Sequence, residues 1–190
     1  PVRSGLGYRL ALLHLEAGDA AAASQVLAAS EAAGLPDRLA SERGLLRAKV
    51  QAALGDPVGA AASLGGAGTL AADELRARLL EQAGDWRGAV QALEAAAART
   101  IPASGPIPEG AADLVMRQAT AAVQLADAGL LQSLNKRYAE RLSGPQRDVF
   151  RLLTAAPVGG VGDLPRAAAE LTLAQTAAEL TLVRAVPAAR

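Results

Sequence analysis

The dipeptide Gly-Asp recurs three times in the first half of this chain, each time between two stretches whose apolar residues follow helical spacing. The copies are Gly18-Asp19, Gly55-Asp56 and Gly84-Asp85. Glycine readily adopts the left-handed backbone conformation that ends a helix, and aspartate caps the first turn of a helix that follows. The dipeptide therefore predicts a tight turn between two antiparallel helices, used three times.

Alignment of the chain on these three glycines places similar residues at four further positions. Seven residues before the glycine stand Ala11, Ala48 and Ala77, and five residues after it stand Ala23, Ala60 and Ala89. Five residues before it stand Leu13, Val50 and Leu79, and nine residues after it stand Leu27, Leu64 and Leu93. We expect the alanines where the two helices cross closely and the larger aliphatic residues in the core. A helical hairpin cannot bury its apolar face alone, so the units are expected to stack.

A family resemblance rests on these residues. The stretch Gly84-Asp85-Trp86-Arg87-Gly88-Ala89-Val90-Gln91-Ala92-Leu93 resembles the turn and second helix of a tetratricopeptide repeat (TPR), as does the segment 11–27. The resemblance covers about residues 3–98, and the whole chain is similar to the C-terminal part of long TPR-like proteins from α-proteobacteria. It implies an all-α fold, a right-handed α-solenoid of antiparallel TPR-like hairpins with a C-terminal capping helix.

The rest of the chain continues this helical pattern with two interruptions. We expect helices near 4–17, 20–32, 37–54, 57–64, 70–83 and 86–99, which make three hairpins within residues 1–99. Residues 100–108 are a Pro-rich loop. Residues 109–155 hold a degenerate fourth hairpin, its turn at Asp127-Ala128-Gly129 out of register with the others, and a short helix near 145–155. Residues 156–163 are a linker and residues 164–187 a C-terminal helix.

Composition narrows the classes of function. Lys and Arg number 19 and Asp and Glu also 19, whereas nucleic-acid-binding proteins usually carry a basic excess, so we expect no nucleic-acid partner. The absence of cysteine excludes disulfides and thiolate metal sites. The sequence has no long uncharged apolar run, so we expect no transmembrane segment. The preference for Arg over Lys suggests a GC-rich bacterial genome. Cytoplasm and periplasm both fit, and the start at Pro1 is consistent with a targeting segment that was removed.

Candidates for catalysis are few. His14 is the only histidine, so a His-cluster metal site cannot form, and no pattern brings a Ser and an Asp to it. The Gly-rich segments 65–68 and 159–162 lack the Gly-Lys-Ser/Thr ending of a phosphate-binding loop. We predict no catalytic residue, no metal and no cofactor. The chain is expected to be a protein–protein interaction scaffold, not an enzyme.

The resemblance also implies where a partner binds. In TPR-like solenoids, the first helices of the hairpins line a groove that takes a peptide or a partner protein. The groove positions carried over are Tyr8, Leu12, Leu15, Glu42, Leu45, Lys49, Glu74, Arg78 and Glu81. The family's clamp for a terminal carboxylate needs asparagines, and Asn135 is the only one in the chain, so we expect no such clamp. As an alternative, residues 100–108 fill the groove.

The predicted C-terminal helix offers a second interface. Ala-Ala-Glu-Leu-Thr-Leu occurs at 168–173 and again at 177–182. An offset of nine residues is two and a half helical turns, so Leu171 and Leu180 lie on opposite sides. The alternative function is therefore a structural or assembly subunit of a bacterial envelope or motility complex, in which this helix mediates self-association into a homo-oligomer or docking. The simpler interpretation is an Ala-rich terminal helix without a partner.

Overall fold

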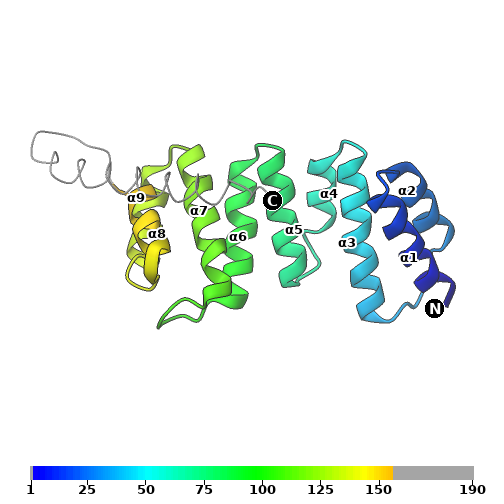
Figure 1. Ribbon diagram of the computed structural model, residues 1–190, viewed down its shortest axis with the longest axis horizontal. Coiled ribbons are helices and arrows are strands. Elements are labelled where there is room, and N and C mark those ends of the chain that lie inside the picture. The colour runs from blue at the N-terminus through cyan, green and yellow to red at the C-terminus, as the bar shows by residue number, and fades with distance from the viewer. Residues whose placement is uncertain (1, 156–190) are drawn as a thin grey trace, which may run out of the picture. The chain divides into compact units, whose positions relative to one another are not determined.

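The computed structural model describes residues 2–155, and all regular structure in this range is helical (Figure 1). In chain order the helices are α1 (Val2–Glu16), α2 (Ala20–Ala29), α3 (Asp37–Ala53), α4 (Pro57–Ser63), α5 (Leu70–Gln82), α6 (Trp86–Thr100), the short 3-10 helix η1 (Glu109–Ala111), α7 (Ala112–Gln124), α8 (Ala128–Tyr138) and α9 (Gly144–Leu153). No strand occurs among these residues, which confirms the all-α prediction. The predicted linker 156–163 and the predicted helix 164–187, with Leu171 and Leu180, lie outside the described range.

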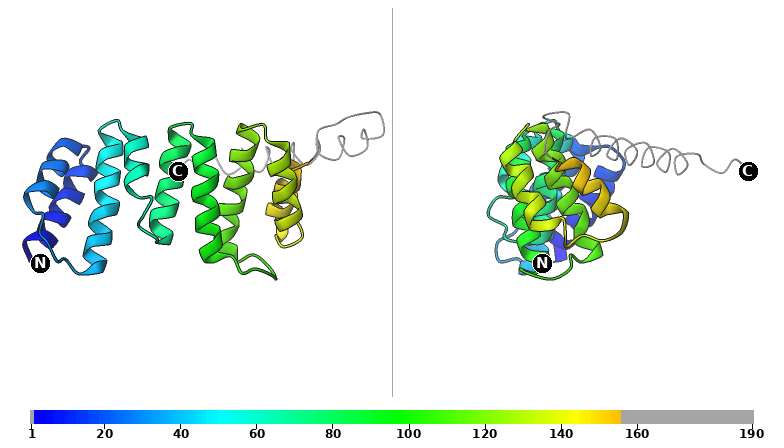
Figure 2. Two further views of the ribbon diagram at one scale, coloured as in Figure 1. Left: turned by 180° about the vertical axis from the view of Figure 1, so that it is seen from behind. Right: turned by 90° about the vertical axis from the view of Figure 1, so that its left-hand side faces the viewer.

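The described residues divide into two compact units, 2–99 and 100–155. In the first unit α1 packs on α2 and α3 packs on α4, and neighbouring pairs meet where α2 contacts α3 and α4 contacts α5. Figures 1 and 2 show α5 and α6 side by side as a third pair. The first helices of neighbouring pairs also touch, α1 with α3 and α3 with α5. The first unit therefore consists of three antiparallel helical pairs.

Each Gly-Asp dipeptide forms a turn of the same construction. Gly18, Gly55 and Gly84 have φ angles of 81°, 97° and 74°, in the left-handed region where a Cβ is strained. The amide of each glycine donates to the carbonyl three residues earlier, and the amide of each aspartate donates to the carbonyl five residues earlier. These two bonds are the Schellman arrangement, which satisfies carbonyls at the end of the first helix.

The aspartates cap the second helices. The carboxylates of Asp19, Asp56 and Asp85 each accept a hydrogen bond, 2.8 to 2.9 Å long, from the amide three residues later. Asp56 also accepts from Gln51 Nε2 at 2.8 Å. The bond from Gln51, followed by that from the Gly59 amide, holds the pKa of Asp56 below its usual value, because both bonds stabilise the charged form.

A fourth turn of this construction joins α7 to α8, and it corrects the prediction of a turn at Asp127-Ala128-Gly129. Ala126 takes the place of the glycine with a φ of 51°, and no other non-glycine residue in the described range has a positive φ. The amides of Ala126 and Asp127 repeat the two Schellman bonds. Asp127 caps α8 by accepting from the Leu130 amide at 2.9 Å. The fourth turn is therefore in register with the others, and the buried Ala119 continues the alanine position seven residues before it.

Burial follows the aligned positions, with one exception. The alanines seven residues before and five residues after each turn glycine of the first unit are fully buried, and Leu27, Leu64 and Leu93 are nearly so. Val50 and Leu79 are also buried, but Leu13, at the equivalent position, is 61% exposed. The prediction that Leu13 fills the core is therefore wrong. Helices α2 and α4 pack on α3 and α5 respectively, whereas Leu13 remains uncovered.

Arg43 of α3 is a buried arginine that joins the first two hairpins. Its Nη1 donates to the Ser4 carbonyl at 2.8 Å and to Ser30 Oγ at 3.1 Å, and its Nη2 donates to the Leu27 carbonyl at 2.8 Å. Ser4 Oγ in turn donates to the Ser30 carbonyl at 2.8 Å. Leu27 and Ser30 lie at the C-terminal end of α2, where the helix dipole favours a cation. Three acceptors from α1 and α2 thus take the place of the water that would otherwise solvate the guanidinium.

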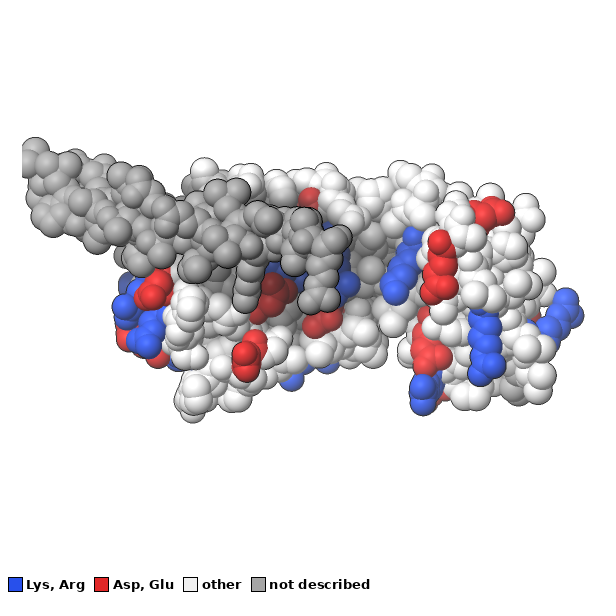
Figure 3. All heavy atoms as spheres, in the orientation of Figure 1, with Lys and Arg blue, Asp and Glu red and all other residues white. Residues whose placement is uncertain are grey.

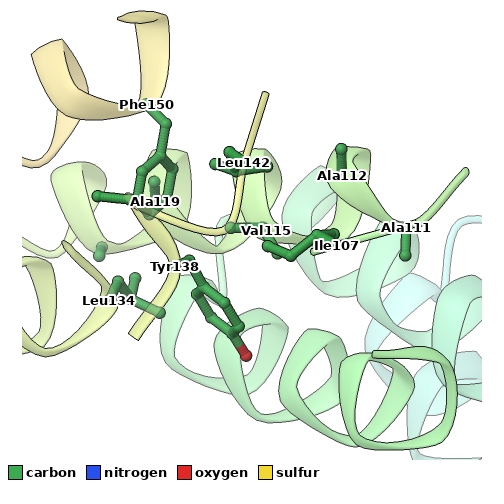
Figure 4. Close-up of a cluster of buried hydrophobic side chains, with 11 residues drawn as sticks. Ile107, Ala111, Ala112, Val115, Ala119, Leu134, Tyr138, Leu142 and Phe150 are labelled. Carbon is green, nitrogen blue, oxygen red and sulfur yellow. The ribbon is translucent and has the colours of Figure 1, made fainter. Parts of the chain in front are cut away.

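The second unit has its own core, formed by α7, α8 and α9. Tyr138 and Phe150 are fully buried in it beside Val115 and Leu142, and Ile107 joins them from the preceding loop (Figure 4). Arg141 fixes that loop by donating from Nε to the Gly105 carbonyl at 2.8 Å and from Nη2 to the Pro102 carbonyl at 2.6 Å. The Pro-rich loop is therefore held within the second unit by Ile107 and Arg141.

Candidate functional site

The predicted groove residues lie on α1, α3 and α5 at matching distances from the turn glycines. Tyr8, Leu45 and Glu74 stand ten residues before the glycine, and Leu12, Lys49 and Arg78 stand six residues before it. Because the three turns have one construction, matching residues leave their helices in the same direction. The helices α1, α3 and α5 also contact one another in sequence. These positions therefore share one face of the first unit.

The α1 part of this face belongs partly to the core. Tyr8, Leu12 and Leu15 are half-buried and pack on a cluster of buried residues that includes Leu27 and Val50. Their remaining exposed area offers an apolar surface without a charged group. A partner here would gain contact area but no ion pair.

The start of α3 is occupied by an internal ion pair. Glu42 accepts from Arg38 Nε at 2.8 Å, four residues earlier on the same helix. The hydrogen bond that Arg38 donates to Glu42, followed by the negative charge of Glu42, raises the pKa of Arg38. Glu42 therefore lies on the predicted face but has a cation of its own, and the half-buried Leu45 separates it from Lys49 along the helix.

A depression of about 370 Å³ lies between α3 and α5, and it brings two of the predicted residues together. The residues that line it are Lys49, Ala52, Ala53, Leu75, Arg78, Leu79 and Gln82. Lys49 and Arg78 supply positive charge, and small or aliphatic side chains supply the apolar lining. Predicted groove residues from two helices thus line one common hollow here.

The two cations differ in their surroundings. The ammonium of Lys49 is exposed and makes no hydrogen bond or ion pair with another described residue. The guanidinium of Arg78 lies 3.7 Å from the Glu74 carboxylate, and its side chain is 60% exposed. Exposed pairs of this kind contribute little to stability, so a carboxylate from outside can compete for Arg78. On the face that Figure 3 shows, positive and negative side chains of the described residues are interspersed.

Comparison with known proteins does not identify this groove. No known protein family, curated protein or solved structure matches the chain. The assignment of the site therefore depends on its own residues and geometry.

Residues 2–155 carry neither a metal-binding cluster nor a membrane-spanning helix. Among residues 2–155, no three His, Asp or Glu side chains come close enough together to hold a metal ion. His14 is half-buried on α1. In that same range, no helix combines the length and the apolar character needed to cross a bilayer.

The corrected fourth turn reveals positions that the sequence interpretation missed. Counting back from Ala126 places Met116 and Thr120 of α7 at the positions of Glu74 and Arg78, and Val123, which is 42% exposed, at the position of Glu81. The signal was present in the sequence, because Ala126-Asp127 replaces Gly-Asp and Ala119 stands seven residues earlier. The Gly-Asp pattern does not include it, because Ala126 stands where the pattern has glycine.

Proposed function

We propose that this chain is a protein–protein interaction scaffold that binds a peptide or an extended segment of a partner protein, without catalysis. The observation that carries the proposal is the depression between α3 and α5, where Lys49 and Arg78 stand over an apolar lining. A site of this kind fixes a ligand by shape and charge and needs no reacting group.

The architecture in this proposal is a TPR-like α-solenoid. Its support comes from the three Gly-Asp turns, which have one construction and give α1, α3 and α5 matching positions in the three hairpins of the first unit. The turn between α7 and α8 repeats this construction within the second unit. Repeats built in this way present equivalent residues of successive first helices along one surface. The resemblance of residues 3–98 to tetratricopeptide repeats points in the same direction.

The lining of the depression suggests the chemistry of the ligand. An aliphatic side chain would lie against Leu75 and Leu79, and a carboxylate one or two residues away would meet Lys49 or Arg78. Arginine can hold a carboxylate through two parallel hydrogen bonds, and lysine acts as a mobile point charge. We therefore propose a ligand segment in which Asp or Glu adjoins Leu, Ile or Val.

The test is a selection from a displayed library of random twelve-residue peptides on the full chain. Enriched peptides are expected to combine acidic and aliphatic residues, and to lose at least about tenfold in affinity for a Lys49→Ala, Arg78→Ala variant, which is the loss typical of one or two charged contacts. Arg38→Ala is the matched control, because Arg38 is an exposed cation of α3 that does not line the depression. Binding that is equal in the two variants would refute the proposal.

The assembly function remains a second proposal, in which the chain is a structural subunit of a bacterial envelope or motility complex. It depends on Leu171 and Leu180, which lie outside the described residues. Nothing in residues 2–155 favours it over the groove.

A further inference from the structure

Arg43 of α3 is a buried cation that no carboxylate among the described residues neutralises. It is 2% exposed, and its three hydrogen bonds go to uncharged oxygen atoms of Ser4, Leu27 and Ser30. The N–H group on Nε and the second N–H group on Nη2 have no acceptor among residues 2–155. A buried charge without a counter-charge is unfavourable, so Arg43 retains the capacity to bind an anion.

The packing of the hairpins does not require an arginine at this position. Counting twelve residues back from the turn reaches Arg43 in α3, Ala72 in α5 and Leu114 in α7. Ala72 and Leu114 are both buried, so a small or aliphatic side chain fills this position in the other two helices. The charge of Arg43 therefore has a reason other than the stacking of helices.

Arg43 lines a hollow of about 350 Å³ between α3 and the loop that follows α2. Arg47, one turn later on α3, and Glu31 of the loop line the same hollow, and Arg47 Nη2 donates to the Glu31 carboxylate at 2.9 Å. Both side chains of this pair are exposed, so the pair contributes little to stability. Two guanidiniums and one carboxylate give the hollow one positive charge in excess, which a single carboxylate of a ligand would balance.

An apolar hollow adjoins the charged one. Glu31 and Arg47 also line a second hollow of about 320 Å³ between α2 and α3, whose lining includes the aliphatic side chains of Leu27 and Val50. The exposed ion pair thus stands at the boundary between the two hollows. Volumes of about 300–1,000 Å³ suit small organic ligands. We propose that the two hollows bind a small aliphatic carboxylate, whose carboxylate meets the two arginines and whose hydrocarbon part lies in the apolar hollow.

This site is separate from the depression between α3 and α5. Arg47 and Lys49 are two residues apart, so their side chains leave α3 about 200° apart. The two hollows and the depression have no lining residue in common. The inference therefore goes beyond the binding of a peptide and does not depend on it.

Hexanoate is the probe, and its binding is measured by NMR in the isotopically labelled full chain. It is expected to shift the amide signals of Ala32, Gly34 and Leu35, which line the charged hollow, until they saturate. Hexanol lacks the charge and should bind at least about threefold more weakly. Acetate lacks most of the hydrocarbon part and should bind at least about tenfold more weakly. Hexanol that binds as tightly as hexanoate, or signals that do not saturate with hexanoate, would overturn the inference.

Two substitutions at the exposed ion pair should change the affinity in opposite directions, which a loss of folding would not do. Arg47→Ala removes a cation and should weaken hexanoate binding about three- to fivefold. Glu31→Gln removes the competing carboxylate and should strengthen binding by about the same factor. The Lys49→Ala, Arg78→Ala variant is the matched control and should bind hexanoate as the original chain does. A Glu31→Gln variant that binds no better than the original chain, or a control variant that loses binding, would overturn the inference.

Discussion

Ala126 stands in a backbone conformation that alanine disfavours, so Ala126→Gly is expected to stabilise the second unit. Its φ of 51° lies in the left-handed region, which costs a residue with a Cβ about 1–2 kcal/mol. Glycine removes that strain but adds conformational entropy to the unfolded chain, worth about 0.4–1 kcal/mol in the opposite direction. Ala126 is exposed and buries no contact that glycine would lose. The net expectation is a gain of about 0.5–1 kcal/mol.

Urea unfolding followed by circular dichroism measures this gain in the full chain. Two controls establish that the backbone angle is the cause. Gly18→Ala should destabilise by about 1 kcal/mol through the reverse exchange, since an added Cβ there meets no atom within 4 Å. Ala98→Gly, at an exposed helical position of α6, should also destabilise, by about 0.5–1 kcal/mol. A loss of stability in Ala126→Gly would refute the assignment of this turn.

Three further predictions concern the first unit. Arg43→Met should lower the free energy of unfolding by about 2–4 kcal/mol in urea titrations, because it leaves three buried acceptors without the donor that Arg43 supplies. An unchanged urea midpoint would contradict a stabilising role of Arg43. Gly7→Ala should destabilise the first unit by about 1–3 kcal/mol, because a Cβ at this position would collide with the Ser30 side chain. Adding Ser30→Gly should restore most of the lost stability. A double variant as unstable as Gly7→Ala would contradict the contact. The pKa of Asp56 in an NMR titration should lie below its usual value and rise in Gln51→Ala. The stabilisation from its lowered pKa is complete above the usual pKa and is lost as pH falls through the folded-state pKa; a pKa unmoved by Gln51→Ala would argue against the bond.

The local structure of the first unit was largely predictable, because its signals are short-range. The starts predicted at residues 37, 57, 70 and 86 are those of α3, α4, α5 and α6 in the structure. Each start follows a proline or a capping side chain, and such signals act within one helical turn. The position of the fourth turn was not predicted, because Ala126 and not glycine adopts the left-handed conformation there. Propensity rules do not anticipate a strained alanine at such a position.

Packing between hairpins could not be predicted in the same way. Leu13, Val50 and Leu79 occupy one position of the repeat, yet Leu13 is exposed and the other two are buried. Their environment depends on which helix lies before them, and a residue's own spacing does not contain that information. Arg43 is a similar case, because its acceptors come from α1 and α2, up to 39 residues away in the chain.

The positions proposed for a groove follow from the repeat, whereas the shape of the surface at those positions does not. The resemblance placed nine residues on one face, and the structure gathers Lys49 and Arg78 around a single depression while Glu42 pairs with Arg38. Which side chains meet across α3 and α5 depends on the offset between neighbouring helices. That offset is set by buried contacts such as those of Ala72 and Leu79.

The most direct test of the proposed function is a charge exchange across the depression. An acidic peptide selected on the full chain is titrated, by isothermal calorimetry, into the chain and into the Lys49→Glu, Arg78→Glu variant. The variant should bind it at least about tenfold more weakly, because like charges then face each other. A peptide in which lysine replaces each acidic residue should recover binding to the variant and bind poorly to the original chain. Equal affinity of the acidic peptide for both proteins would contradict the proposal that this depression is the binding site.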